Sequence, residues 1–96
     1  MTEMQAWRIR VEGRVQGVGY RRWLARQASK RSVSGWVRNC DDGAVEALLC
    51  GEPGDVGYVL ARSRQGPATG HVSVVTASRS AVEPRDGFDV VDGITG

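Results

Sequence analysis

The strongest constraint on the fold of this sequence is a switch in the spacing of its apolar residues. Residues 5–12 alternate between apolar and charged side chains, which is the period of a strand that buries one face. Residues 20–31 change to the period of a helix with one apolar side. The apolar residues are Trp7, Ile9 and Val11 in the first segment and Tyr20, Leu24 and Ala28 in the second. A strand followed directly by an amphipathic helix favours a layered α/β architecture.

Two more strands are predicted on either side of a tight turn. Residues 33–39 and 44–50 carry the apolar and β-branched side chains of strands, and residues 40–43 between them end in Asp-Gly. Asp-Gly between two strand patterns is a strong hairpin signal. A second helix is predicted over residues 55–65, with Gly66 at its end.

The last part of the chain completes the pattern. A fourth strand is predicted around Val72, Val74 and Val75, whose imperfect alternation indicates an irregular register or a bulge. Residues 78–87 are predicted to be a polar loop and residues 88–91 a short fifth strand. The order β-α-β-β-α-β with an extra β predicts a ferredoxin-like α/β sandwich, also classed as α+β. It has a mostly antiparallel sheet of four to five strands and two helices on one face.

Composition fits one such domain over residues 1–96, with its core between about residues 5 and 91. Apolar residues make up 41% of the chain and charged residues 25%, as in an ordinary globular domain. No apolar run approaches the roughly 20 residues of a membrane span, and we find no signal peptide near the N-terminus. We therefore expect a cytoplasmic monomer that contacts no membrane.

The net charge and the few histidines and cysteines argue against two classes of function, nucleic-acid binding and metal-dependent chemistry. The net charge of +2 is too small for a dedicated nucleic-acid binder. His71 is the single histidine, and Cys40 and Cys50 lack the spacing of a zinc site, so no metal or cofactor is expected. The hairpin puts the two cysteines roughly 20 Å apart, whereas a disulfide needs Cα atoms within about 7 Å. Both thiols are therefore predicted to be free.

A glycine-rich turn, residues 13–19, joins the first strand to the first helix. Gly17 and Gly19 can adopt positive φ, which lets successive N–H groups point into one concavity. The helix that follows adds unpaired N–H groups and a dipole that favours an anion. Arg21 at its start can supply a guanidinium fork for phosphate oxygens. Alone, the segment is more typical of a plain β-to-α connection, and it has neither a Walker motif nor a dinucleotide fingerprint.

Asn39, at the end of the second strand, brings a second candidate group. Alone it is typical of a residue that caps a hairpin turn. In the split βαβ unit, however, the first two strands run parallel with the third between them, so their C-terminal ends meet at one edge of the sheet. The glycine-rich turn, Arg21 and Asn39 are therefore expected to converge.

Two segments carry a family resemblance. Residues 13–21 (GRVQGVGYR) resemble the first signature of the acylphosphatases, and residues 35–45 (GWVRNCDDGAV) resemble the second. The 18-position separation of Arg21 and Asn39 also matches, and weaker similarity covers about residues 5–91. The resemblance implies hydrolysis of the carboxyl-phosphate bond of acyl phosphates, without a metal or a covalent intermediate.

The resemblance also implies a role for each site residue. Arg21 binds the phosphoryl group and Asn39 orients the attacking water. The phosphate-binding loop, whose backbone N–H groups cradle the oxygens, consists of Gln16, Gly17, Val18, Gly19 and Tyr20. The expected partners are a small acyl phosphate as substrate and inorganic phosphate as product and inhibitor. Several positions depart from the family's pattern. Residues 74–77 and 78–87 match it only loosely, and where the first helix of the family often ends in Leu-Gly this chain has Arg31-Ser32. We expect a residue with a Cβ in the αL region at that point.

Two alternatives remain at this stage. One is a non-catalytic acylphosphatase-like module that binds phosphate or carbamoyl phosphate. The other is an RNA-binding ferredoxin-like domain, which needs exposed aromatic residues on the central strands and a basic sheet face. Trp36 is available for that role, but Trp7 is predicted on the core side. Turnover of a small aryl acyl phosphate distinguishes these readings.

Overall fold

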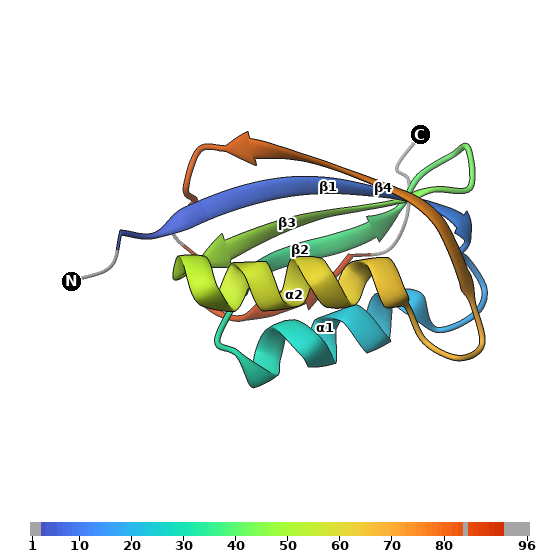
Figure 1. Cartoon of the computed structure of the whole chain (residues 1–96), viewed down its shortest axis with the longest axis horizontal. Helices are drawn as coiled ribbons and strands as arrows, with labels where there is room; N and C mark the ends of the chain where they lie inside the picture. The colour runs from blue at the N-terminus through green and yellow to red at the C-terminus, as the bar shows by residue number, and fades with distance from the viewer. Residues whose placement is uncertain (1–2, 84, 92–96) are drawn as a thin grey trace.

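Five strands form one sheet, and both helices pack against the same face of it (Figure 1). The computed structural model describes residues 3–83 and 85–91. Its elements are β1 (Gln5–Arg14), α1 (Tyr20–Lys30), β2 (Ser34–Asn39), β3 (Val45–Gly51), α2 (Pro53–Gln65), β4 (His71–Ser80) and β5 (Phe88–Val90). The predicted ferredoxin-like sandwich is confirmed. Neither helix in the described part of the chain is long and apolar enough to cross a membrane.

The strand order β4-β1-β3-β2-β5 determines where a site can form. β3 lies between β1 and β2 and is antiparallel to both, so β1 and β2 point the same way. β5 extends the sheet parallel to β2. The C-terminal ends of β1, β2 and β5 therefore share one end of the sheet with the N-terminus of α1, at the right of Figure 1.

The core lies between the sheet and the two helices. Ile9 and Val11 on β1 are fully buried, as the alternation predicted, and Leu24 of α1 and Val59 of α2 pack against the same cluster. Burial of each such side chain contributes roughly 1.5–3 kcal/mol to the free energy of unfolding. Trp7 packs at the edge of this cluster, on the helix side of the sheet.

β4 corrects the sequence prediction at its C-terminal end. Residues 78–80, expected in a loop, continue the strand, and Ser78 and Ser80 pair with Arg8 and Ala6 of β1. Polar side chains gave no strand signal because this end of β4 is an edge with little apolar surface to bury. The interaction with the backbone of β1 determines its structure instead.

The irregular spacing of the valines in β4 has a local cause. The register shifts between Glu12, which pairs with Val74, and Gly13, which pairs with Val72. The extra residue in β4 brings both Val72 and Val75 to the helix face, where they contact the core. Val74 is left exposed on the opposite face. The predicted irregularity is confirmed.

Two smaller predictions are also confirmed. Ser32, after the last turn of α1, has a φ of 57° and is the one non-glycine residue with positive φ in the described ranges. Cys40 and Cys50 are free thiols. Cys50 pairs with Ser34 at the far end of the hairpin, whereas the Cys40 N–H donates to the Ala44 carbonyl at the turn.

Candidate active site

The β1–α1 loop uses glycine where the backbone turns into the helix. Gly17 has a φ of 75°, and Gly19, the N-cap residue of α1, has a φ of 81°. No side chain caps this helix and no acidic residue lies in its first turn. The free N–H groups and the positive end of the helix dipole therefore remain available to an anion.

A cavity of about 200 Å³ opens beside this helix N-terminus. The residues around it are Val15, Gly17, Gly19, Tyr20, Arg21, Arg22, Asn39 and Val90. The loop, Arg21 and Asn39 thus converge as the topology predicted. None of these lining residues is acidic, so the cavity favours a negative ligand.

Asn39, which lines this cavity, also carries a buried, unsatisfied acceptor. Among the described residues, its Oδ1 is the one buried side-chain oxygen or nitrogen without a hydrogen-bond partner. An unsatisfied buried acceptor costs roughly 1–3 kcal/mol of stability. In an otherwise well-paired fold, this unpaired atom marks Asn39 as a candidate functional residue.

Arg21 is held in place by the last strand. Its Nη1 donates to the Val91 carbonyl over 2.8 Å, directly after β5. The rest of the guanidinium retains donors for a second acceptor, which suits a phosphoryl group. Sequence reasoning missed Val90, Val91 and Arg22 as site residues, because nothing local in residues 88–91 indicates which strand they will pair with.

Two side chains fix the loop from outside the cavity. Gln16 Nε2 donates to the carbonyls of Cys40 and Ala44, each over 2.8 Å. Thr69, from the α2–β4 connection, donates its hydroxyl to the Val18 carbonyl over 2.7 Å. The side chains of Gln16 and Thr69 therefore support the loop, and neither Gln16 nor Val18 lines the cavity.

A model of the acylphosphatase family matches residues 7–90. The chain belongs to the acylphosphatase family. An acylphosphatase from Rhodopseudomonas palustris is 52% identical over 67 residues, which cover 70% of this chain and 68% of that protein. One from Rhizobium etli is 44% identical over 84 residues, covering 85% of this chain and 89% of the relative. The structure of an acylphosphatase from Bacillus subtilis matches with a TM-score of 0.88 at 35% identity, covering 91% of this chain and 98% of that one.

Two titratable groups in or next to the segments that line the cavity have raised pKa values. Burial raises the pKa of Tyr20, whose hydroxyl donates to the Ser63 carbonyl over 2.8 Å. Burial, followed by the nearby Glu46 carboxylate, raises the pKa of the Cys40 thiol. A protonated phenol and a protonated thiol are poor bases and poor nucleophiles. Tyr20 thus serves as packing beneath the loop, as the sequence predicted.

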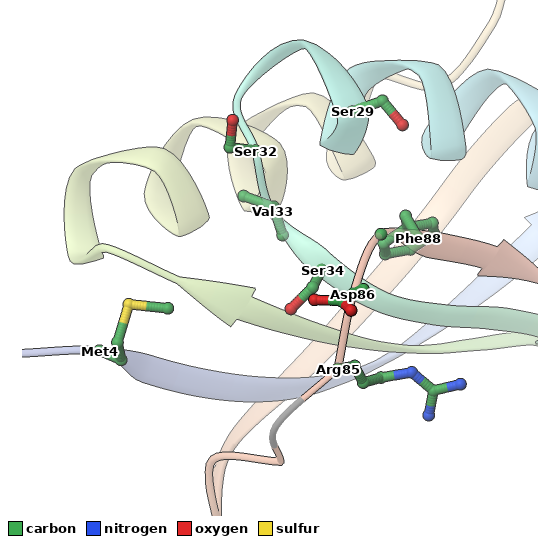
Figure 2. Close-up of a pocket in the computed structure, with 9 residues that line it drawn as sticks. Met4, Ser29, Ser32, Val33, Ser34, Arg85, Asp86 and Phe88 are labelled. Carbon is green, nitrogen blue, oxygen red and sulfur yellow. The ribbon is translucent and has the colours of Figure 1, made fainter.

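A larger hollow of about 430 Å³ lies at the opposite end of the acylphosphatase fold. Figure 2 shows Ser29 and Ser32 at the C-terminal end of α1 and Arg85 directed away from Met4. Arg85 already pairs with Asp89 over 3.0 Å. Asp86 also lines this hollow. Because the hollow contains a carboxylate and its arginine is already paired, it does not suit an anion, although it is larger than the cavity beside Arg21.

Proposed function

We propose that this chain hydrolyses acyl phosphates to a carboxylate and inorganic phosphate at the cavity beside Arg21. Arg21 holds the phosphoryl group, and Asn39 orients the attacking water. The backbone N–H groups of residues 16–20 surround the phosphoryl oxygens. The observation that carries this assignment is that Arg21, Asn39 and the uncapped N-terminus of α1 line one cavity.

The reaction requires little covalent chemistry from the protein. The water oxygen attacks phosphorus, the bond from phosphorus to the carboxyl oxygen breaks, and its electron pair leaves on the carboxylate. The water proton passes to an oxygen of the transferred phosphate. Because a carboxylate is a good leaving group, positioning and stabilisation of the negative charge provide most of the catalysis.

The geometry supplies both requirements before substrate arrives. The hydrogen bond from Arg21 to the Val91 carbonyl restricts the guanidinium, and the loop turns through the positive φ of Gly17 and Gly19, which both line the cavity. Donors that are already oriented do not have to reorganise as charge develops on the phosphoryl oxygens. The two partners of the mechanism, Arg21 and Asn39, come from elements whose positions the sheet determines.

The cellular location, oligomeric state and partners of the chain are also part of the proposal. We propose a cytoplasmic monomer that uses no metal and binds neither nucleic acid nor membrane. An RNA-binding surface is disfavoured because Trp7 packs on the helix side of the sheet. On the open face, the guanidinium groups of Arg10 and Arg38 are paired with Asp42 and Glu46.

Turnover of benzoyl phosphate tests the proposal directly. We expect release of benzoate and phosphate at a rate that a chelator leaves unchanged, with inorganic phosphate as a competitive inhibitor. Loss of activity with chelator and its return with a divalent ion would contradict the metal-free reaction. Tight binding of phosphate or carbamoyl phosphate by a chain that turns over neither benzoyl phosphate nor carbamoyl phosphate would favour the non-catalytic module instead.

A further inference from the structure

The amide of Gln16 joins two segments that lie far apart in the sequence. Gln16 is in the β1–α1 loop, and its two acceptors are the carbonyls of Cys40 and Ala44 on either side of the β2–β3 turn. The same two residues close that turn, since the Cys40 N–H donates to the Ala44 carbonyl over 2.8 Å. Gln16 therefore binds the base of the turn and leaves its tip free.

The neighbours of these contacts are the two halves of the proposed site. Gly17 follows Gln16 and lines the cavity, and Asn39 precedes Cys40 and lines it from the other side. The two hydrogen bonds of the Gln16 side chain, called the Gln16 clamp below, thus lie one residue away from Gly17 on one segment and from Asn39 on the other. Loss of either Gln16 contact would remove a direct link between the loop and the segment that carries Asn39.

An amide nitrogen is well suited to this contact. An NH₂ group has two donors, so it can satisfy two carbonyls at once, whereas a hydroxyl has only one. The other tie to the turn is the ion pair of Arg10 with Asp42. Its side chains are largely exposed, and exposed pairs of this kind contribute little. The Gln16 amide is thus the principal polar connection between the loop and the turn among the described residues.

We propose that Gln16 is a positioning residue for hydrolysis, and that its side chain sets the distance between the phosphate-binding loop and the water held by Asn39. The inference rests on the function proposed above. It assigns to Gln16 a second role, since its backbone N–H belongs to the cradle while its side chain acts through Asn39. Loss of the clamp should leave phosphate binding in place and misplace the water.

Three substitutions of Gln16 separate this role from simple stabilisation. Gln16→Met keeps the length of the side chain and removes both donors. Gln16→Glu keeps the shape as well, but points oxygens at two carbonyls. Gln16→Lys restores donors through an ammonium group. Gln5→Met, at the far end of β1, is the matched control, because Gln5 only accepts a hydrogen bond from Trp7 over 3.3 Å.

Each variant is assayed with benzoyl phosphate at a temperature where near-ultraviolet circular dichroism shows it fully folded. We expect Gln16→Met to lower kcat by about 10- to 100-fold, the range for a misplaced reacting group, with KM and the phosphate inhibition constant within about twofold. Gln16→Glu should lower kcat at least as far. Gln16→Lys should recover kcat to within about fivefold of the wild type, since it again offers donors to both carbonyls.

The same variants give a readout that does not depend on activity. Hydrogen exchange of the Cys40 backbone amide should accelerate in Gln16→Met and remain slow in Gln16→Lys and in Gln5→Met. A folded Gln16→Met enzyme with wild-type kcat, or with equal losses in kcat and phosphate affinity, would overturn the inference alone. An inactive wild-type chain would instead overturn the proposed function and, with it, the catalytic role of Gln16.

Discussion

The two ends of the sheet lie beside opposite ends of α1 and therefore differ in electrostatic character. At one end the uncapped N-terminus of α1 meets Arg21 and Asn39 in a cavity without carboxylates. At the other end the C-terminus of the same helix meets a hollow that contains Asp86 and a cation already paired with Asp89. The helix dipole is positive at the first end and negative at the second.

This difference shows that the size of a cavity is a poor guide to its chemistry. The hollow in Figure 2 has about 430 Å³, against about 200 Å³ for the cavity beside Arg21. The smaller cavity is nevertheless lined by the uncapped N-terminus of α1, by Arg21 and by Asn39. An anion therefore gains more from binding in the smaller one.

The largest effect is expected when the cation is removed from the site. Arg21→Ala should lower kcat/KM for benzoyl phosphate at least about 100-fold, because two charge-assisted hydrogen bonds are lost at roughly 1.5–3 kcal/mol each. Arg21→Lys should recover little, since an ammonium group cannot reproduce the fork. Arg85→Ala at the opposite end is the control and should stay within about twofold of the wild type. Similar losses for Arg21→Ala and Arg85→Ala would remove the distinction between the ends.

A second test uses the two ends of a single strand. Asn39→Ala should lower kcat about 10- to 100-fold with little change in KM, because Asn39 orients the water and does not hold the phosphate. Ser34→Ala, at the other end of β2, should leave both constants near their wild-type values. Steady-state kinetics of both variants with one substrate provides the measurement. An effect of Asn39→Ala on KM alone would make Asn39 a binding residue.

The opposite end should respond in stability and not in activity. Ser32→Gly should raise the free energy of unfolding by about 1 kcal/mol, because glycine adopts the left-handed region without the Cβ penalty. That gain corresponds to an increase of roughly 4–8 °C in Tm for a domain of this size. Ser29→Gly, within the helix, should instead cost about 0.5–1 kcal/mol. Equal Tm values for Ser32→Gly and the wild type would show that Ser32 is unstrained.

The smallest effect concerns pH and the residue beneath the loop. Burial raises the pKa of Tyr20, so above pH 10 the unfolded chain loses this proton while the folded chain keeps it. Stability then falls with rising pH by at most about 1.4 kcal/mol per unit from this group. Tyr20→Phe should show a shallower fall between pH 10 and 11 than the wild type in denaturant titrations. Tyr58→Phe serves as the control, and parallel curves for all three proteins would contradict the assignment.

Local sequence signals were sufficient to predict the backbone of the candidate site. The Gly17 and Gly19 spacing predicted positive φ at both positions, and the element order predicted that the loop would lie next to Asn39. These inferences succeeded because the hydrophobic pattern determines strand direction, and strand direction determines which loops meet. The catalytic roles of Arg21 and Asn39 remain predictions.

Long-range polar contacts could not be predicted in the same way. The hydrogen bonds of Gln16 to Cys40 and of Arg21 to Val91 depend on how segments 24 and 70 positions apart are placed. A single polar side chain gives no sign of which carbonyl it will find. Residues 78–80 were missed for a related reason, since β1 recruits them through its backbone and their side chains carry no strand pattern.

The parallel pairing of β5 with β2 has a practical consequence for engineering this chain. β1 starts at the end of the sheet remote from the N-terminus of α1 (Figure 1), whereas Val91, directly after β5, accepts a hydrogen bond from Arg21. An affinity tag, surface linker or fluorescent protein is therefore best attached ahead of β1, where its bulk lies away from incoming substrate.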